Sequence, residues 1–268
     1  IVCLPNMQVL ATTLGVCDRF TYQLLKHKDV FRTLQMLLML QITVSEGLLA
    51  NYVNHTNREI RMMARLNYIT CSRNAPYRYL LVELNEEQPL YRPMILNYVF
   101  GWMMFQDRLM PNFLNLADRV ENEDSAAFLV REVALWGKEN EKEEVKDYFL
   151  DKRLKVRSAA IEVVATLGDV SAEDKLVESY FQQPEHIRQE VLRTLLALNS
   201  GKRTEFFKEA YEMSSSRETH AVALQCLYKY GNSGRRLFEI MRNEADEETR
   251  MLIDQVDSMI LLEQLQVL

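Results

Sequence analysis

Residues 156–168 read VRSAAIEVVATLG, and a similar stretch, IRQEVLRTLLALN, returns 31 residues later at 187–199. A third copy, THAVALQCLYKYG, follows at 219–231, and an earlier copy ends as FLVREVALWG at 128–137. A recurrence at a fixed period of about 31 residues indicates a tandem array of one supersecondary unit. This period decides the expected fold class.

Each copy predicts one helix and its end. Apolar residues inside a copy are three and four positions apart, as at Ile161, Val164 and Leu167, which places them on one stripe of an α-helix. Each copy then ends in Gly or Asn, which adopt the left-handed conformation past a helix end most readily. We therefore expect four equivalent helices to be closed by Gly137, Gly168, Asn199 and Gly231.

A second helix is expected in each unit, because an apolar residue lies eight positions past three of these terminators, at Val145, Leu176 and Phe207. One helical hairpin of this length cannot cover its own apolar face, so successive hairpins must stack. Weaker copies extend the array to about eight units with atypical caps at both ends. These copies begin at Phe31, Ile60, Tyr91 and Thr249, with an opening helix over 10–25 and a closing helix that reaches Leu268.

An apolar residue followed by Arg precedes the helical stripe in several copies, as at Val156-Arg157 and Ile187-Arg188. This pattern resembles the HEAT repeat family, in its compact bacterial variety with about 31 residues per unit, over nearly the whole chain. The resemblance implies an all-α, right-handed α-solenoid of armadillo-like hairpins. It also implies that Arg157 and Arg188 pair with acidic residues in neighbouring turns. The Arg is absent at Ala126 and His220, so the ladder is not regular.

Composition excludes several classes of protein. Only 8 Gly and 6 Pro occur in 268 residues, which disfavours folds with many tight turns, and no glycines fall at phosphate-loop spacing. The four cysteines form no CxxC pair and the four histidines lie far apart, so no metal or cofactor is expected. HEAT-like di-iron hydroxylases use His-Glu dipeptides, which this chain lacks. We expect no catalytic residues and no enzymatic activity.

Charge is distributed unevenly along the chain. Residues 1–120 carry 12 Lys and Arg against 9 Asp and Glu, whereas residues 121–268 carry 20 against 29. An acidic surface repels nucleic-acid phosphates, which disfavours extended nucleic-acid binding. We interpret 1–268 as a single array, with less regular repeats and an N-terminal cap in 1–120 and regular repeats and a C-terminal cap in 121–268.

No run of 18 apolar residues occurs, so no bilayer span is expected. Unpaired cysteines packed as small apolar residues indicate a reducing compartment, and we expect a cytoplasmic location. Tethering to a membrane through a segment upstream of Ile1 is left open.

Aromatic and basic residues gather between positions 73 and 108, where we expect a partner to bind. Aromatic rings and guanidinium groups gain much on desolvation at interfaces, and the run 77–79 cannot point entirely inward. Methionines such as Met39, Met63 and Met94 would suit a plastic binding surface, but core packing is favoured for them. The candidate binding residues are Arg73, Tyr77, Arg78, Tyr79, Tyr91, Arg92 and Arg108.

These observations favour a non-catalytic scaffold or adaptor that binds a protein or peptide along the concave face of the array, lined by the second helix of each hairpin. The alternative is a nucleic-acid-binding protein, similar to the DNA glycosylases built on HEAT-like repeats. That alternative requires the basic residues of the first 120 positions to converge on one face.

Overall fold

The computed structural model describes residues 4–87 and 91–266, and this part of the chain contains 17 α-helices, two short 3-10 helices and no strand. The all-α class expected from the repeat is therefore confirmed. None of the described helices is long and apolar enough to cross a bilayer. Ile1 and Leu268, which bear on the expected anchor and closing helix, lie outside the described residues.

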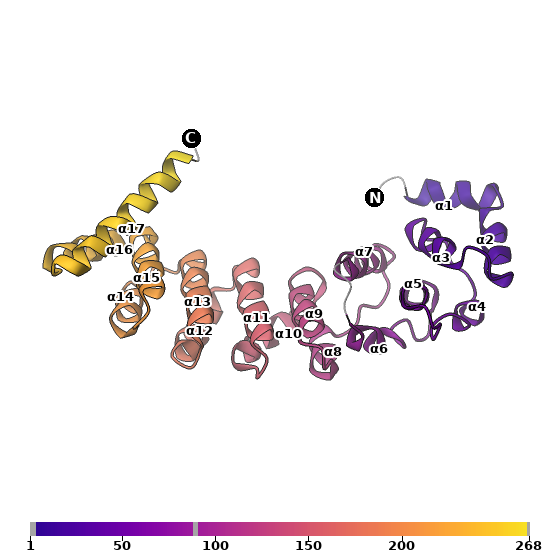
Figure 1. Cartoon of the computed structure of the whole chain (residues 1–268), viewed down its shortest axis with the longest axis horizontal. Coiled ribbons are helices and arrows are strands. Elements are labelled where there is room, and N and C mark those ends of the chain that lie inside the picture. The colour runs from indigo at the N-terminus through magenta and orange to yellow at the C-terminus, as the bar shows by residue number, and fades with distance from the viewer. Residues whose placement is uncertain (1–3, 88–90, 267–268) are drawn as a thin grey trace. The chain divides into compact units, whose positions relative to one another are not determined.

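The chain divides into two compact units, Ile1–Glu132 and Val133–Leu268. Figure 1 shows the helices of both units. The helices of the first unit are α1 (Leu4–Thr13), α2 (Val16–Leu25), α3 (Val30–Met39), α4 (Glu46–Ala50), α5 (Arg58–Cys71), α6 (Leu80–Asn85), α7 (Arg92–Phe105), α8 (Phe113–Arg119) and most of α9 (Glu123–Trp136).

The second unit continues from the end of α9. Its helices are α10 (Glu139–Glu144), the 3-10 helix η1 (Val145–Leu150), α11 (Leu154–Leu167), the 3-10 helix η2 (Val170–Ala172), α12 (Glu173–Tyr180), α13 (Glu185–Leu198), α14 (Thr204–Met213), α15 (Arg217–Lys229), α16 (Gly231–Glu244) and α17 (Glu247–Gln266).

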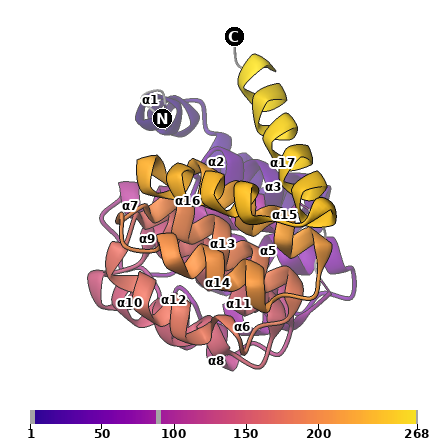
Figure 2. The same cartoon turned by 90° about the vertical axis from the view of Figure 1, so that its left-hand side faces the viewer.

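Within each unit, helices pack on others that are close in the sequence. In the second unit α11 contacts α13, α13 contacts α15, and α15 contacts α17, while α12 and α14 pack beside them. Figure 1 shows α11, α13 and α15 side by side with α12 and α14 along the lower edge. Figure 2 shows α16 and α17 beside α15 at the C-terminal end of this unit. In the first unit α3, α5 and α7 follow one another in the same way.

Burial follows the apolar stripes that the repeat predicts. Ile161, Val164 and Leu195 of the first helices in their hairpins are buried, and so are Val145, Leu176 and Phe207 of the second helices. Each stripe is therefore covered by the neighbouring helices of its unit. The second helix that contains Val145 is a 3-10 helix, which continues α10 with a tighter turn.

The helix terminators behave differently from one another. Gly168 (φ 66°) and Asn199 (φ 45°) are left-handed directly after α11 and α13. Gly137 follows α9 but is not among the residues with positive φ. Gly231 is left-handed (φ 75°), yet Tyr230 caps α15 and Gly231 begins α16. The left-handed residue expected past this helix is therefore found at Gly231, whereas the left-handed backbone expected at Gly137 is not found.

The arginines at the start of the repeat helices bind main-chain carbonyl groups. Arg157 donates through Nε to the carbonyl oxygen of Asp151 and through Nη1 to Gln183 Oε1, at 3.0 Å. Arg188 donates to the carbonyl oxygens of Gln183 and Phe181, both at 2.9 Å. In the described chain neither pairs with an acidic residue of a neighbouring turn, contrary to the expectation. Carbonyl groups at the end of the preceding helix lack helical partners, and the guanidinium group satisfies them.

In other copies of the repeat, the residue at the position of Arg157 also contacts the preceding turn. His220 Nε2 lies 2.8 Å from the carbonyl oxygen of Ser214, so the histidine contacts the preceding turn where the Arg is missing. Arg61 donates to the carbonyl oxygen of His55 at 2.7 Å and also pairs with Glu86. The acid pairing expected for Arg157 and Arg188 is thus found at Arg61, in the first unit.

Candidate functional site

The structure does not place the predicted binding residues on one face of the first unit. Tyr91 lines an apolar groove, Arg73 and Arg108 line a separate polar pocket, and Arg92 is buried. The remaining three residues, Tyr77, Arg78 and Tyr79, lie in the turn that leads into α6.

Arg92 is fully buried at the start of α7. Its Nη1 lies 3.2 Å from Glu83 Oε1, and its Nη2 donates to Ser125 Oγ at 3.0 Å. Burial lowers the pKa of Arg92, and the Glu83 carboxylate opposes that effect. Arg92 therefore stabilises the packing of α6 and α7, and the structure gives a partner no access to it.

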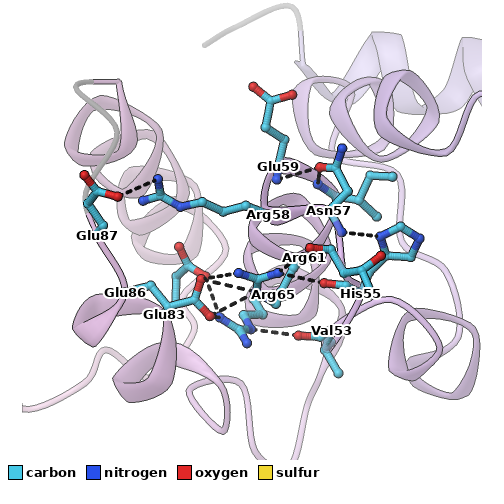
Figure 3. Close-up of polar contacts among 12 residues, drawn as sticks. Val53, His55, Asn57, Arg58, Glu59, Arg61, Arg65, Glu83, Glu86 and Glu87 are labelled. Carbon is cyan, nitrogen blue, oxygen red and sulfur yellow. Dashed lines mark hydrogen bonds and ion pairs between the residues drawn. The ribbon is translucent and has the colours of Figure 1, made fainter.

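The partner of Arg92, Glu83, belongs to a network of ion pairs that joins α5 to the end of α6. Figure 3 shows Arg61 and Arg65 facing Glu83 and Glu86 in this network. Arg65 Nη1 lies 3.0 Å from Glu83 Oε2 and 2.6 Å from Glu86 Oε1, and Arg61 Nη2 lies 2.8 Å from Glu86 Oε2. Hydrogen bonds from Arg61, and then the neighbouring Arg65, lower the pKa of Glu86 to about 2. Three arginines of the first unit are therefore engaged in contacts inside the fold.

Sequence reasoning did not find this network. The sequence shows that Arg61 and Arg65 are four residues apart on one helix face and that Glu83 and Glu86 are three apart, but it does not show that the two pairs meet. When α5 and α6 pack together, the two arginines of α5 face the two glutamates at the end of α6.

The turn at 77–79 is mostly anchored to the fold. Tyr77 donates its hydroxyl to the carbonyl oxygen of Leu109 at 2.7 Å, and burial raises the pKa of Tyr77 above its usual range. The Tyr79 ring meets the edge of Tyr68, with centroids 4.9 Å apart, and Arg78 lies over Tyr79. Arg78 is the member of the run that is exposed to solvent.

An apolar groove of about 670 Å³ lies over α3, α5 and α7. These are the first helices of their hairpins, whereas the binding face was expected along the second helices. Two methionines project from it with large exposed fractions, 58% for Met39 and 71% for Met94. The lining residues are Phe31, Gln35, Leu38, Met39, Glu59, Met63, Tyr91, Met94, Ile95 and Tyr98.

The groove is built mostly from hydrocarbon and ring surface with polar groups at its margin. Tyr98 donates its hydroxyl to the carbonyl oxygen of Met39 at 3.1 Å, which ties α7 to the end of α3. Burial, and next the Glu59 carboxylate, raise the pKa of Tyr91. Glu59 is the one charged residue among those that line the groove. The site therefore suits an apolar ligand with a single positive charge.

The methionines differ in their exposure. Met62, Met63 and Met103 are buried, as core packing predicts, and Met63 also contributes to the floor of the groove, whereas Met39, Met94 and Met104 are exposed. The sequence of α7 indicates why some of its methionines are exposed, because residues 92–105 place apolar side chains on every side of the helix. Such a helix presents more apolar surface than one neighbour covers.

Among the residues that the structure describes, no group of three or more His, Cys, Asp or Glu is placed to hold a metal ion. The chain matches no protein-family model, and no curated protein matches it. The resemblance to HEAT repeats therefore rests on the residue pattern itself.

Proposed function

We propose that this chain is a HEAT-like α-solenoid scaffold that binds an amphipathic helical segment of a partner protein in the groove over α3, α5 and α7. The repeat period and the packing of helices on near neighbours within each unit support a stacked array. The observation that carries the binding proposal is the apolar groove with exposed Met39 and Met94.

The chemistry of the groove indicates its occupant. Methionine side chains are flexible and polarizable, so they adapt to apolar residues of different shape, and aromatic rings add large contact areas. A helix presents such residues at positions i, i+3, i+4 and i+7, which is how amphipathic segments fill apolar grooves. Glu59 at the margin favours a segment that also carries Lys or Arg.

Nucleic acid is less well supported as a partner. Of the basic residues in the first unit, Arg61, Arg65 and Arg92 are bound to Glu83 and Glu86 inside the fold. Their charge is largely neutralised there, so it adds little to a surface that would attract phosphates.

The test is selection of binders from a displayed library of helical peptides with the full chain as bait. Enriched peptides should share apolar residues at i, i+3 or i+4 and i+7 together with Lys or Arg. Met94→Glu should weaken their binding by about tenfold or more, because it sets a carboxylate against apolar side chains. Met213→Glu is the matched control, since Met213 is a similarly exposed methionine (66%) in the second unit.

Three outcomes contradict the proposal. The first is no enrichment, and the second is enriched peptides that bind the Met94→Glu and wild-type chains equally. The third is a concentration-dependent dimer in sedimentation that Met94→Glu abolishes, which would make a second copy of the chain the occupant. Glu59→Lys should in addition shift the selected peptides from basic to acidic.

A further inference from the structure

A second pocket in the first unit shares no residue with the groove. It has a volume of about 610 Å³, within the range of small-molecule sites. It is lined from α1, α2, α5, α7 and the segment 41–44, together with Arg73 in the turn after α5 and with Gln106 and Arg108 just past α7. Residues from several parts of the unit therefore converge on one cavity, which we call the polar pocket.

The polar pocket carries positive charge. Arg73 and Arg108 line it, and no Asp or Glu is among its lining residues. Arg108 is held in place by the carbonyl oxygens of Thr70, at 3.0 Å, and Ser72. A guanidinium group has five N–H donors, so further donors of Arg108 remain for a ligand. Arg73 is exposed to solvent, and no hydrogen bond or ion pair is recorded for its side chain within the described chain.

Neutral donors and an apolar wall complete the polar pocket. Thr12, Thr43 and Gln106 contribute hydroxyl and amide groups, and the Trp102 ring contributes apolar surface. Gln41, which also lines the pocket, is left-handed (φ 55°) directly past the end of α3, where the amide of Ile42 donates to the carbonyl oxygen of Leu37 at 2.9 Å. The end of α3 therefore fixes the segment 41–44 at the pocket wall.

We propose that the polar pocket binds a small organic anion, with its carboxylate or phosphate between Arg73 and Arg108 and its apolar part against Trp102. Arginine forks match both of these anions in geometry and remain charged at any physiological pH. No Asp or Glu lines the pocket itself, and the apolar wall distinguishes such a ligand from an inorganic ion. This site is independent of the groove proposed for a partner peptide.

Phenyl phosphate and benzoate are suitable probes, followed by fluorescence of Trp102 in a Trp136→Phe background. The chain has two tryptophans, and the indole nitrogen of Trp136 has no hydrogen-bond partner in the described structure, so its replacement breaks no hydrogen bond. At constant ionic strength, at least one probe should give a saturable change at millimolar concentration, whereas phenol should give none. The probe that gives a saturable fluorescence change identifies the preferred anion, phosphate or carboxylate.

Arg73→Gln should weaken probe binding by about tenfold or more, since it removes a charge-assisted hydrogen bond. Arg119→Gln is the matched control, because Arg119 is exposed in the same unit and does not line the pocket. Bound probe should also slow alkylation of Cys17, which lines the pocket. Failure of both probes to saturate, or equal weakening by Arg73→Gln and Arg119→Gln, overturns the proposal. The groove variant Met94→Glu should leave probe binding unchanged.

Discussion

Replacing Glu86 by Gln tests how strongly the ion network between α5 and α6 stabilises the first unit. The pKa of Glu86 is about 2 rather than the ordinary 4.5, because Arg61 and, to a lesser extent, Arg65 donate hydrogen bonds to its carboxylate. Proton linkage converts this difference into at most about 3 kcal/mol of unfolding free energy at neutral pH. A quarter of the side chain is exposed, so solvent screening reduces the expected loss to about 1–2 kcal/mol.

The pH dependence has a definite sign. A carboxyl group whose pKa is lowered by folding stabilises the folded state fully above its unfolded pKa, and that stabilisation is lost as pH falls through the folded pKa. The wild-type protein should therefore lose this contribution between about pH 4.5 and about pH 2. The amide introduced by Glu86→Gln does not titrate, so the difference in stability between the two proteins should shrink over that interval.

The measurement is urea unfolding of the full chain at a series of pH values, followed by Trp102 fluorescence in the Trp136→Phe background. Trp102 lies in the first unit and reports on its unfolding. Glu87→Gln is the control, since Glu87 is 93% exposed and its ion pair with Arg58 is 3.7 Å long. The reasoning is refuted if the deficit of Glu86→Gln stays constant down to about pH 2, or if Glu87→Gln destabilises the unit equally.

Two further predictions concern stability and are measured by urea unfolding. Leu195→Ala should cost about 2–5 kcal/mol because Leu195 is fully buried in α13, whereas Leu135→Ala, at a site 57% exposed, should cost under about 1 kcal/mol; equal costs would contradict the assigned burial. Gly168→Ala should destabilise the protein by about 1 kcal/mol, because the backbone there is left-handed (φ 66°), although nothing crowds an added Cβ atom. Gly47→Ala should instead stabilise the protein by about 0.5–1 kcal/mol, because Gly47 lies in the helical backbone of α4. The same sign for both glycine variants would show that backbone conformation does not decide their effect.

Much of the secondary structure of the second unit was predictable from sequence, because it depends on local features. Apolar spacing such as that of Ile161, Val164 and Leu167 acts within two helical turns, and the left-handed cap at Gly168 depends on the absence of one Cβ atom. The first unit was less predictable, since its repeats are irregular.

The cluster expected between 73 and 108 covers only part of the groove, since six of the ten residues that line the groove lie between 31 and 63. Arg73, Tyr91 and Arg92 belong to one cluster in the sequence, yet they lie in a polar pocket, in an apolar groove and in the buried interior. Residue type does not distinguish these outcomes, because each depends on which helix covers the position.

The sequence by itself determined that the chain is all-α, where several of its helices end, and that aromatic and basic residues are concentrated near 73–108. Only the tertiary structure decided that Arg61, Arg65 and Arg92 neutralise Glu83 and Glu86, and that Met39 and Met94 remain exposed in a groove. The physical reason is that helix formation and termination depend on neighbours within a few residues. Burial and ion pairing depend on helices that approach from tens of residues away, and no local pattern encodes that approach.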